Sequence, residues 1–502
     1  MRDSSFSKEQ TGTKNTQALD QEIMNNWEPT IGLEVHVQLA TNSKIFSSAP
    51  ATFGANPNAN ANNIDLAMPG SLPVLNEAAV RMAIKFGLSI DAEIASVCRF
   101  DRKNYFYPDL PKGYQISQLD QPIVGRGTFK MVISNGDIRQ IGITRAHLEE
   151  DAGKSIHGVK SGLTGIDLNR AGTPLLEIVS EPELRSAEEA AEYFRKLHAL
   201  VTYLEICDGN LSEGSMRCDA NVSVRDSSQS ELGERTEIKN INSFRFVQRA
   251  IEYEISRQIG ILETGGTIER ETRLYDADLN ETRQMRGKEL SADYRYFPDP
   301  DLPSLTISSD LVETIRSTLP EMPEAKTHRY ISELGLPMSD ALRLTSDHAI
   351  AQYFENVVDI SGNAKSSANW ILGPIFSALN NADLETLQFP VSEENLGTLI
   401  QRVDDGTISS KIAKDIFDSI CHEGGSVDDL IKSKGLHQLN NTDELEKIIL
   451  KILENNPKQV EQFLAGKQKL LGFFVGQAMR ATSGKANPKT VNDLLEKFLS
   501  KS

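Results

Sequence analysis

Two residues able to carry chemistry, Glu34 and His36, stand two positions apart within residues 30–39. The odd positions of that stretch are apolar, and its even positions are polar or glycine. A period of two predicts a strand with one face on a core. A carboxylate and an imidazole side by side on a strand could bind a metal ion or transfer a proton. A solvent-facing strand that happens to carry both is the simpler interpretation of this stretch alone.

An acidic run offers partners for this pair. Glu149, Glu150 and Asp151 follow a second predicted strand directly. Three consecutive acids are costly to crowd together without a cation nearby. Neighbouring residues of a strand point to opposite faces, so only one of Glu149 and Glu150 can join Glu34 and His36. The alternation does not decide which one joins them.

Basic and amide side chains form a further set of candidates. Lys103 lies among the aromatic residues of the stretch 100–109 and could contact a phosphate as a point charge. A packed aromatic loop is the alternative for that stretch. Asn169 and Arg170 precede a Gly-Thr-Pro turn and suit the recognition of a carboxylate or phosphate, which Arg can contact in bidentate fashion.

The same alternation returns in two later stretches, 216–224 and 237–241, again with an apolar side and a polar side. Polar candidates on these stretches, and on the loop before the first, are Glu213, Arg217, Asp219, Asn221, Glu237 and Lys239. Several strands of one sheet would therefore present acids, amides and cations on their non-core faces.

This set of side chains suits phosphoryl transfer. Carboxylate oxygens with an occasional His are ligands for a hard cation such as Mg²⁺, and Arg and Lys nearby would bind phosphates. The sequence contains no Walker A motif, kinase glycine loop or dinucleotide fingerprint, so ATP would lie on an open sheet. Without a GxSxG motif or a cysteine in a nucleophile's context, we do not expect this chain to release ammonia from an amide.

Composition bounds the class of protein. A chain of 502 residues predicts two to four domains. The net charge of −18 argues against a general nucleic-acid coat. Four scattered cysteines without a CxxC pair argue against structural zinc and disulfides, and they suit the cytosol. No apolar run is long enough to span a membrane, and residues 1–26 are interpreted as a disordered extension that lacks signal-peptide features.

The predicted secondary structure changes near residue 303. Before it, strands, turns and a few helices alternate; the runs 129–133 and 138–144 flank an Asn-Gly turn within 134–137, which predicts a hairpin. Ser186 and Ser243 are predicted to cap two packing helices. Beyond residue 303, helical periodicity takes over. Residues 458–502 hold eight Lys and Arg against three acids, which predicts either a surface for an anionic polymer or a solvated helix face.

Long motifs resemble one family. They are IGLEVHVQL (31–39), FDRKNYFYPD (100–109), HLEEDAGK (147–154), DLNRAGTPLLEI (167–178), EGSMRCDANVS (213–223) and DYRYFPDPD (293–301). From about Trp27 to its end the chain is similar to the GatB/GatE family, the B subunits of aspartyl/glutamyl-tRNA amidotransferases. The tail, with GFFVGQAMR (472–480) and ANPK (486–489), is similar to the family's YqeY-like domain.

The resemblance implies an α+β protein. Residues 27–303 would form a catalytic cradle on an antiparallel, glutamine-synthetase-like sheet. An all-α helical domain would follow over 304–392, and a YqeY-like tail that contacts tRNA over 393–502.

The resemblance also implies an activity. With ATP and Mg²⁺, the B subunit phosphorylates the side-chain carboxylate of misacylated Glu-tRNA(Gln) or Asp-tRNA(Asn), and ammonia then displaces phosphate. The ammonia comes from an amidase (A) subunit, and a small C subunit completes a heterotrimer. We expect a cytoplasmic ligase of protein biosynthesis that has no contact with DNA or membranes.

Site residues follow from the matched motifs. The family's metal positions correspond to Glu34, His36 and Glu150, with Glu149 as the alternative neighbour. Expected contacts to substrate phosphate or carboxylate are Lys103, Arg170 and Arg217, and the expected nucleotide-binding residues are Glu213, Asp219, Asn221 and Lys239, with Glu213 also a possible metal ligand. Many relatives carry Cys-Pro-x-Cys where Asn62 and Asp65 stand here, so we predict no zinc. Two rival hypotheses are an amide ligase for a free small acid and a non-catalytic tRNA-binding scaffold.

Overall fold

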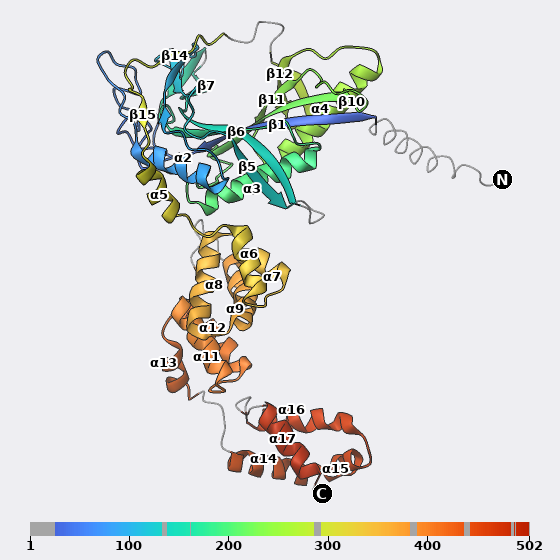
Figure 1. Cartoon of the computed structure of the whole chain (residues 1–502). Helices are drawn as coiled ribbons and strands as arrows, with labels where there is room; N and C mark the ends of the chain where they lie inside the picture. The colour runs from blue at the N-terminus through green and yellow to red at the C-terminus, as the bar shows by residue number, and fades with distance from the viewer. Residues whose placement is uncertain are drawn as a thin grey trace, which may run out of the picture. The chain divides into compact units, whose positions relative to one another are not determined.

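The computed structural model describes residues 26–132, 138–160, 162–285, 293–381, 389–435, 442–482, 486 and 488–500 (Figure 1). The chain divides into two compact units, one reaching Pro320 and the other beginning at Glu321. Residues 1–25 of the predicted extension (1–26) and the predicted hairpin turn at 134–137 lie outside the described residues. No helix among the described residues is long and apolar enough to cross a membrane.

An eight-stranded sheet organises the first unit. Its strands, in spatial order, are β13 (Glu281–Gln284), β12 (Glu271–Asp276), β11 (Thr236–Ile241), β10 (Met216–Asp226), β1 (Trp27–Gln38), β9 (Pro174–Ser180), β6 (Ile138–Glu150) and β5 (Gly127–Val132). Neighbours pair antiparallel except β11 and β12, which run parallel. The predicted antiparallel sheet is therefore mixed, and the predicted pairing of the β5–β6 hairpin is confirmed.

Strand β1 lies in the interior of this sheet, between β10 and β9. Figure 1 shows it beside β10. Its apolar positions, from Ile31 through Val37, are at most 1% exposed, so the predicted core face is confirmed. On the other face Glu34 lies opposite Asp219, and His36 lies between Arg217 of β10 and Glu177 of β9. Residues paired across neighbouring strands share a face, so the sheet brings these side chains together.

Two helices supply the core beneath the strands. α3 (Ala187–Tyr203) packs on β1, and α4 (Phe244–Glu263) packs on β10 and β11. Both predicted N-caps are confirmed: Ser186 accepts a hydrogen bond from the Glu189 N–H, and Ser243 accepts one from the Phe246 N–H. The Glu189 carboxylate also accepts a hydrogen bond from the backbone N–H of Arg185, the residue before the cap.

Shorter elements complete the first unit. They are α2 (Glu77–Ser89), α5 (Ser309–Ser317), the three-stranded sheet of β14 (Phe297–Pro298), β3 (Asp101–Asn104) and β4 (Tyr114–Ser117), the pair β15 (Leu305–Thr306) and β2 (Val97–Cys98), and the pair β7 (Lys154–Lys160) and β8 (Leu163–Asp167). Since Leu305 pairs with Cys98, the chain beyond residue 303 still belongs to this unit. The two units divide near Pro320, later than the predicted boundary at 303/304. The sequence did not predict the short strand at Leu305–Thr306, whose pairing with β2 holds this segment in the first unit.

The described part of the second unit is helical, as the sequence predicted. Its elements are α6 (Pro323–Ser332), α7 (Met338–Leu344), α8 (His348–Ser361), α9 (Ala364–Trp370), a π-helical turn (Ile371–Ile375), α10 (Phe376–Asn381), α11 (Glu393–Asp404), α12 (Ser410–Glu423), α13 (Val427–Ser433), α14 (Thr442–Glu454), α15 (Pro457–Leu464), a 3₁₀ turn (Gln468–Leu470), α16 (Leu471–Ala481) and α17 (Pro488–Leu499).

Two hydrophobic clusters organise these helices. One joins buried residues from Tyr330 to Ile431, and the other joins residues from Leu445 to Leu499. α11 packs closely on α8, because a Cβ at Gly397 would come within 2.5 Å of the Ile360 side chain. Helices α11 to α13 therefore share a core with the preceding helices, and the clusters divide after Ile431 rather than at the predicted boundary 392/393.

Candidate active site

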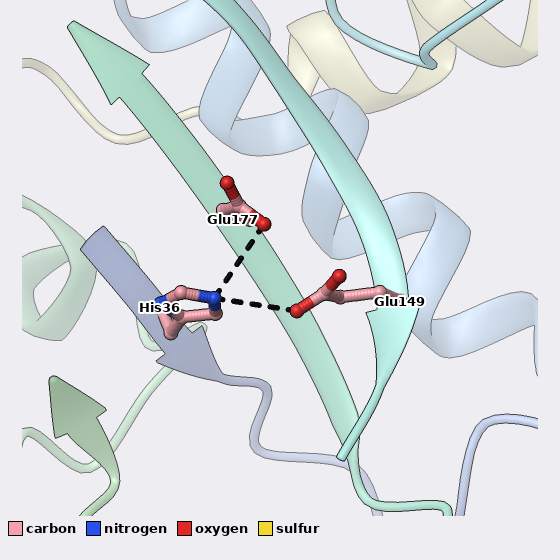
Figure 2. A group of neighbouring side chains, drawn as sticks. All are labelled: His36, Glu149 and Glu177. Carbon is pink, nitrogen blue, oxygen red and sulfur yellow. Dashed lines mark ion pairs between the residues drawn. The ribbon is translucent and has the colours of Figure 1, made fainter. Parts of the chain in front are cut away.

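A cluster of one imidazole and two carboxylates lies on three adjacent strands (Figure 2). His36 comes from β1, Glu149 from β6 and Glu177 from β9. The Nε2 atom of His36 lies 3.4 Å from Glu149 Oε1 and 3.5 Å from Glu177 Oε2. One ligand atom from each residue lies within 4.8 Å of the others, which is close enough for a single cation to contact all three.

A second imidazole, His147, flanks the two acids. Its Nε2 lies 3.3 Å from Glu177 and 3.8 Å from Glu149, and its Nδ1 is buried without a hydrogen-bond partner. Burial lowers the pKa of His36, but the interactions with Glu149 and Glu177 outweigh it and raise the pKa to about 10. The same acids raise the pKa of His147 to about 9 against the effect of burial.

The electrostatics of the acids mirror those of the imidazoles. Burial alone would raise the pKa of Glu149 and of Glu177, yet the two imidazoles hold both pKa values well below the ordinary range. Both carboxylates are therefore ionised and need positive charge beside them. A divalent cation could supply that charge in place of the two imidazolium protons, so the donor set fits a metal site.

Neighbouring side chains orient this cluster. Ser117 of β4 donates a hydrogen bond to Glu149 at 3.2 Å. The ammonium of Lys103 lies 5.1 Å from the centre of the Tyr294 ring and 5.9 Å from that of Tyr105. Burial lowers the pKa of Lys103, but the charge of Glu149 and other nearby groups raises it overall, so this side chain stays cationic beside the acids.

Glu34 anchors a second group on the same face, towards β10 and β11. Asn221 donates a hydrogen bond to Glu34 at 2.9 Å, and the ammonium of Lys239 lies 2.8 Å from Asp219 and 2.9 Å from Glu237. Burial and the charges of Glu177, Glu237 and Asp219 raise the pKa of Glu34. Lys239 contributes a positive charge to this carboxylate-rich group. A bound cation would further reduce the repulsion among Glu34, Asp219 and Glu237.

A third group includes Arg217 of β10, which pairs with His36 across the sheet. Asp151 follows the last residue of β6, and its carboxylate accepts hydrogen bonds from Arg217 at 3.2 Å and from Arg170 at 3.2 Å. The Nε of Arg217 is buried without a partner. Two guanidinium groups on one carboxylate leave net positive charge, which suits an anionic substrate group.

The placement of Glu150 differs from the expectation. Glu150 contacts the Lys112 ammonium, accepts a hydrogen bond from the Ile116 N–H at 2.7 Å, and does not belong to the described metal-ligand cluster. Burial raises its pKa even though Lys112 opposes that shift. The choice left open by the sequence therefore falls on Glu149. A register shift in β6 between Ile143 and Arg145 is the reason that alternation counted from the hairpin could not settle it.

The expectation for Glu213 also differs from its placement. It is an exposed residue before β10, in the lining of a surface hollow with Gln38, Phe53 and Asp208. No hydrogen bond or ion pair among the described residues joins it to Glu34 or His36. Glu213 precedes β10, whose first residue is Met216, and the alternation of that strand therefore does not fix the face on which its side chain lies.

Sequence reasoning missed two residues of the site, Glu177 and His147. Glu177 is the lone charged residue in the otherwise apolar strand Pro174–Ser180, and an acid inside an apolar run was a usable signal. His147 alternates with Glu149 on β6, so the face of one implied the face of the other.

The positions that led us to predict no zinc hold a polar network. Asp65 lies 3.3 Å from the Lys44 ammonium, and it accepts hydrogen bonds from Ser47 Oγ and the Asn62 N–H. Lys44 is fully buried and donates to the Leu168 carbonyl at 3.1 Å. This network ties the loop after β1 to the segment that carries Arg170.

Three side chains that could hold a metal ion, with cations and further acids on the same face of a sheet, are features that suit a group-transfer protein. Comparisons with known proteins refine that class. The GatB/GatE catalytic domain matches residues 29–313, and the GatB domain matches residues 352–499.

Curated relatives cover nearly the whole chain. The B subunit of the aspartyl/glutamyl-tRNA(Asn/Gln) amidotransferase of Thioalkalivibrio sulfidiphilus is 59% identical over 474 residues, which is 94% of this chain and 99% of the relative. The corresponding protein of Alkalilimnicola ehrlichii is 58% identical with the same coverage, and that of Hahella chejuensis is 58% identical over 478 residues, 94% of this chain and all of the relative. The chain belongs to the GatB/GatE family.

Proposed function

We propose that this chain is the B subunit of a tRNA-dependent amidotransferase and converts the side-chain carboxylate of misacylated Glu-tRNA(Gln) or Asp-tRNA(Asn) into an amide. The observation that carries the proposal is that the His36–Glu149–Glu177 cluster shares one sheet face with the carboxylate-rich Glu34 group and with Arg217. Activation of a carboxylate by ATP needs such a surface, because three anionic groups must be held together.

Each group has a distinct part in this proposal. His36, Glu149 and Glu177 would hold Mg²⁺, which when bound neutralises charge on the transferring phosphoryl group. Ser117 keeps the Glu149 carboxylate oriented through its hydrogen bond. Lys103 stays cationic beside these acids and would contact the phosphoryl oxygens.

The Glu34 group would bind the nucleotide. Lys239 would contact its phosphates, and Glu34 with Asp219 would hold a second cation that accompanies them. We keep Asn221 in this group because its amide fixes the Glu34 carboxylate. Glu213 is exposed and lines a hollow that contains none of the residues of this group, so it would not be a metal ligand here.

The Arg170–Asp151–Arg217 group would bind the substrate carboxylate. A carboxylate oxygen attacks the γ-phosphorus of ATP, ADP leaves with the electrons of the broken P–O bond, and an acyl phosphate results. Ammonia then attacks the acyl carbon, phosphate leaves, and an amide remains. Arg217 and Arg170 would hold the carboxylate in line with the phosphorus and neutralise the departing phosphate.

Partners follow from the chemistry. The cysteines do not suit a nucleophile for amide hydrolysis: burial raises the pKa of the buried thiols Cys98, Cys207 and Cys218, and it also raises that of Cys421. An amidase subunit and a small C subunit would therefore complete a heterotrimer. The helical unit, with the Leu445–Leu499 cluster as its tail, would contact tRNA.

Reconstitution tests this function. The chain is assembled with both partner subunits, γ-labelled ATP and misacylated tRNA, and label transfer and amide formation are followed separately. We expect His36→Ala to abolish label transfer to Glu-tRNA while glutamine hydrolysis continues at its basal rate. Glu77→Gln, on the exposed start of α2, is the matched control and should retain full transfer. Amidation that persisted in the His36→Ala complex would support the scaffold hypothesis instead, and turnover with free glutamate would support the small-acid ligase.

A further inference from the structure

A hollow lies just beyond the metal-ligand cluster, where β1 ends. Gln38 lies on the same strand face as Glu34 and His36, two residues further along, and it lines this hollow. The Gln38 N–H donates to the Ser215 carbonyl at 2.8 Å, and Ser215 is part of the same lining. Gln38 therefore belongs both to the lining of the hollow and to the strand that carries Glu34 and His36.

The lining combines a free aromatic ring with hydrogen-bond acceptors. Phe53 contributes a side chain that is 71% exposed, although a ring of this size normally packs. Asp208 and Glu213 contribute exposed carboxylates, and Asn42 contributes an amide. An open ring beside acceptors suits a nucleoside, whose base stacks on an aromatic face and whose hydroxyl and amino groups donate to carboxylates.

The direction of the hollow favours one source of that nucleoside. Phosphoryl transfer places the attacking oxygen and the leaving group on opposite sides of the phosphorus. In the proposed function, which this inference assumes, the nucleotide lies at the Glu34 end of β1. The attacking carboxylate must then approach from the Gln38 end, where the hollow lies, and it would pass Arg217, which pairs with His36 between the two ends.

The reach of the substrate agrees with this direction. The side-chain carboxyl of an esterified glutamate is five bonds from the ester oxygen, each about 1.5 Å long, so the group spans roughly 6 Å when extended. The strand advances about 6.6 Å between His36 and Gln38. A ribose held at the Gln38 end would thus place the carboxyl beside His36.

We propose that the hollow formed by Gln38, Asn42, Phe53, Asp208 and Glu213 binds the 3′-terminal adenosine of the substrate tRNA. Phe53 stacks on the adenine. Glu213 and Asp208 accept hydrogen bonds from its amino and ribose hydroxyl groups. The site thereby recognises the end of the tRNA that bears the amino acid, independently of the surfaces that contact the rest of the tRNA.

Steady-state kinetics of the reconstituted complex test this assignment. Phe53→Ala should raise KM for Glu-tRNA(Gln) roughly tenfold, because it removes a stacking surface. Glu213→Gln should raise the same KM to a smaller extent. Both variants should keep the kcat, the KM for ATP and the Mg²⁺ affinity of the parent complex. Val74→Ala is the matched control, because its side chain is 72% exposed on the same loop but does not line the hollow.

The dinucleotide cytidylyl-adenosine provides a second readout that does not depend on catalysis by the variants. It should inhibit the parent complex in competition with Glu-tRNA(Gln) and not with ATP, and Phe53→Ala should weaken that inhibition about tenfold. An unchanged KM for tRNA in Phe53→Ala, or a raised KM for ATP alone, would overturn the assignment; the second result would give the hollow to the nucleotide. Failure of the proposed function appears elsewhere, as label transfer that survives His36→Ala.

Discussion

Replacing Glu177 by Gln tests the composition of the metal site most sharply. The substitution keeps the size of a side chain that lies between His36 and His147, so β9 should keep its pairing with β1 and β6. It removes one of the two anionic ligands in the cluster. Loss of one preorganised electrostatic contact commonly costs two to three orders of magnitude in rate, so we expect label transfer to fall about 10²–10³-fold.

Binding and catalysis should weaken together in this variant. Titration with Mn²⁺ as a substitute for Mg²⁺ should show at least a tenfold loss of affinity, because the cluster keeps only one carboxylate. The assays are Mn²⁺ titration of the purified chain and single-turnover transfer of label from ATP in the complex. Circular dichroism checks that the fold is retained.

Glu150→Gln is the control, because Glu150 is a neighbouring acid that lies outside the metal-ligand cluster. Glu150 contacts the Lys112 ammonium, which is 12% exposed, so the substitution leaves a largely buried charge without its partner. We expect a loss of stability of about 3 kcal/mol with metal affinity retained. Tight Mn²⁺ binding by Glu177→Gln, together with lost binding by a folded Glu150→Gln, would refute the reasoning from geometry.

Four further substitutions or deletions extend the test. Lys239→Ala should raise KM for ATP about tenfold or more with little change in KM for tRNA, as measured in the reconstituted complex, because it removes a phosphate contact. Arg217→Lys should lower kcat for both misacylated tRNAs about 10–100-fold, because an ammonium group cannot make the two parallel hydrogen bonds of a planar guanidinium. An unchanged kcat would show that Arg217 does not bind the substrate carboxylate. Asp65→Asn should destabilise the first unit by about 3–5 kcal/mol in urea unfolding, because Lys44 would be fully buried without its counter-charge. Removing residues 442–502, which include the whole Leu445–Leu499 cluster, should raise KM for tRNA and flatten its salt dependence while ATP affinity stays constant.

Local sequence patterns predicted the strands and helices that carry the site, but they did not predict which of these elements lie side by side. The alternation of residues 30–39 and 216–224 predicted both strands and their buried faces, because every second side chain of a strand points to the same face and the buried face is apolar. Ser186 and Ser243 marked two helix starts because a cap requires a particular side chain at a particular position. The pairing of His36 with Glu177 depends on strand order, which no local pattern contains.

The misplaced expectations share a physical cause. The register shift in β6 decides between Glu149 and Glu150, and a single extra residue in a strand reverses which side chains face the site. The packing of α11 on α8 extends the helical core to Ile431, and amphipathic periodicity shows that a helix has a partner without showing which one. The short strand Leu305–Thr306 is only two residues long, too short for a periodic signal.

The central claim is that His36, Glu149 and Glu177 hold the divalent cation that serves phosphoryl transfer. Electron spin-echo spectroscopy of the complex loaded with Mn²⁺ and ATP addresses it most directly, because a directly bound imidazole nitrogen couples to the metal's electron spin. We expect a nitrogen coupling that disappears in His36→Gln and persists in Glu150→Gln. A bound Mn²⁺ with only oxygen ligands in the parent complex, or a nitrogen coupling that survives His36→Gln, would contradict the account.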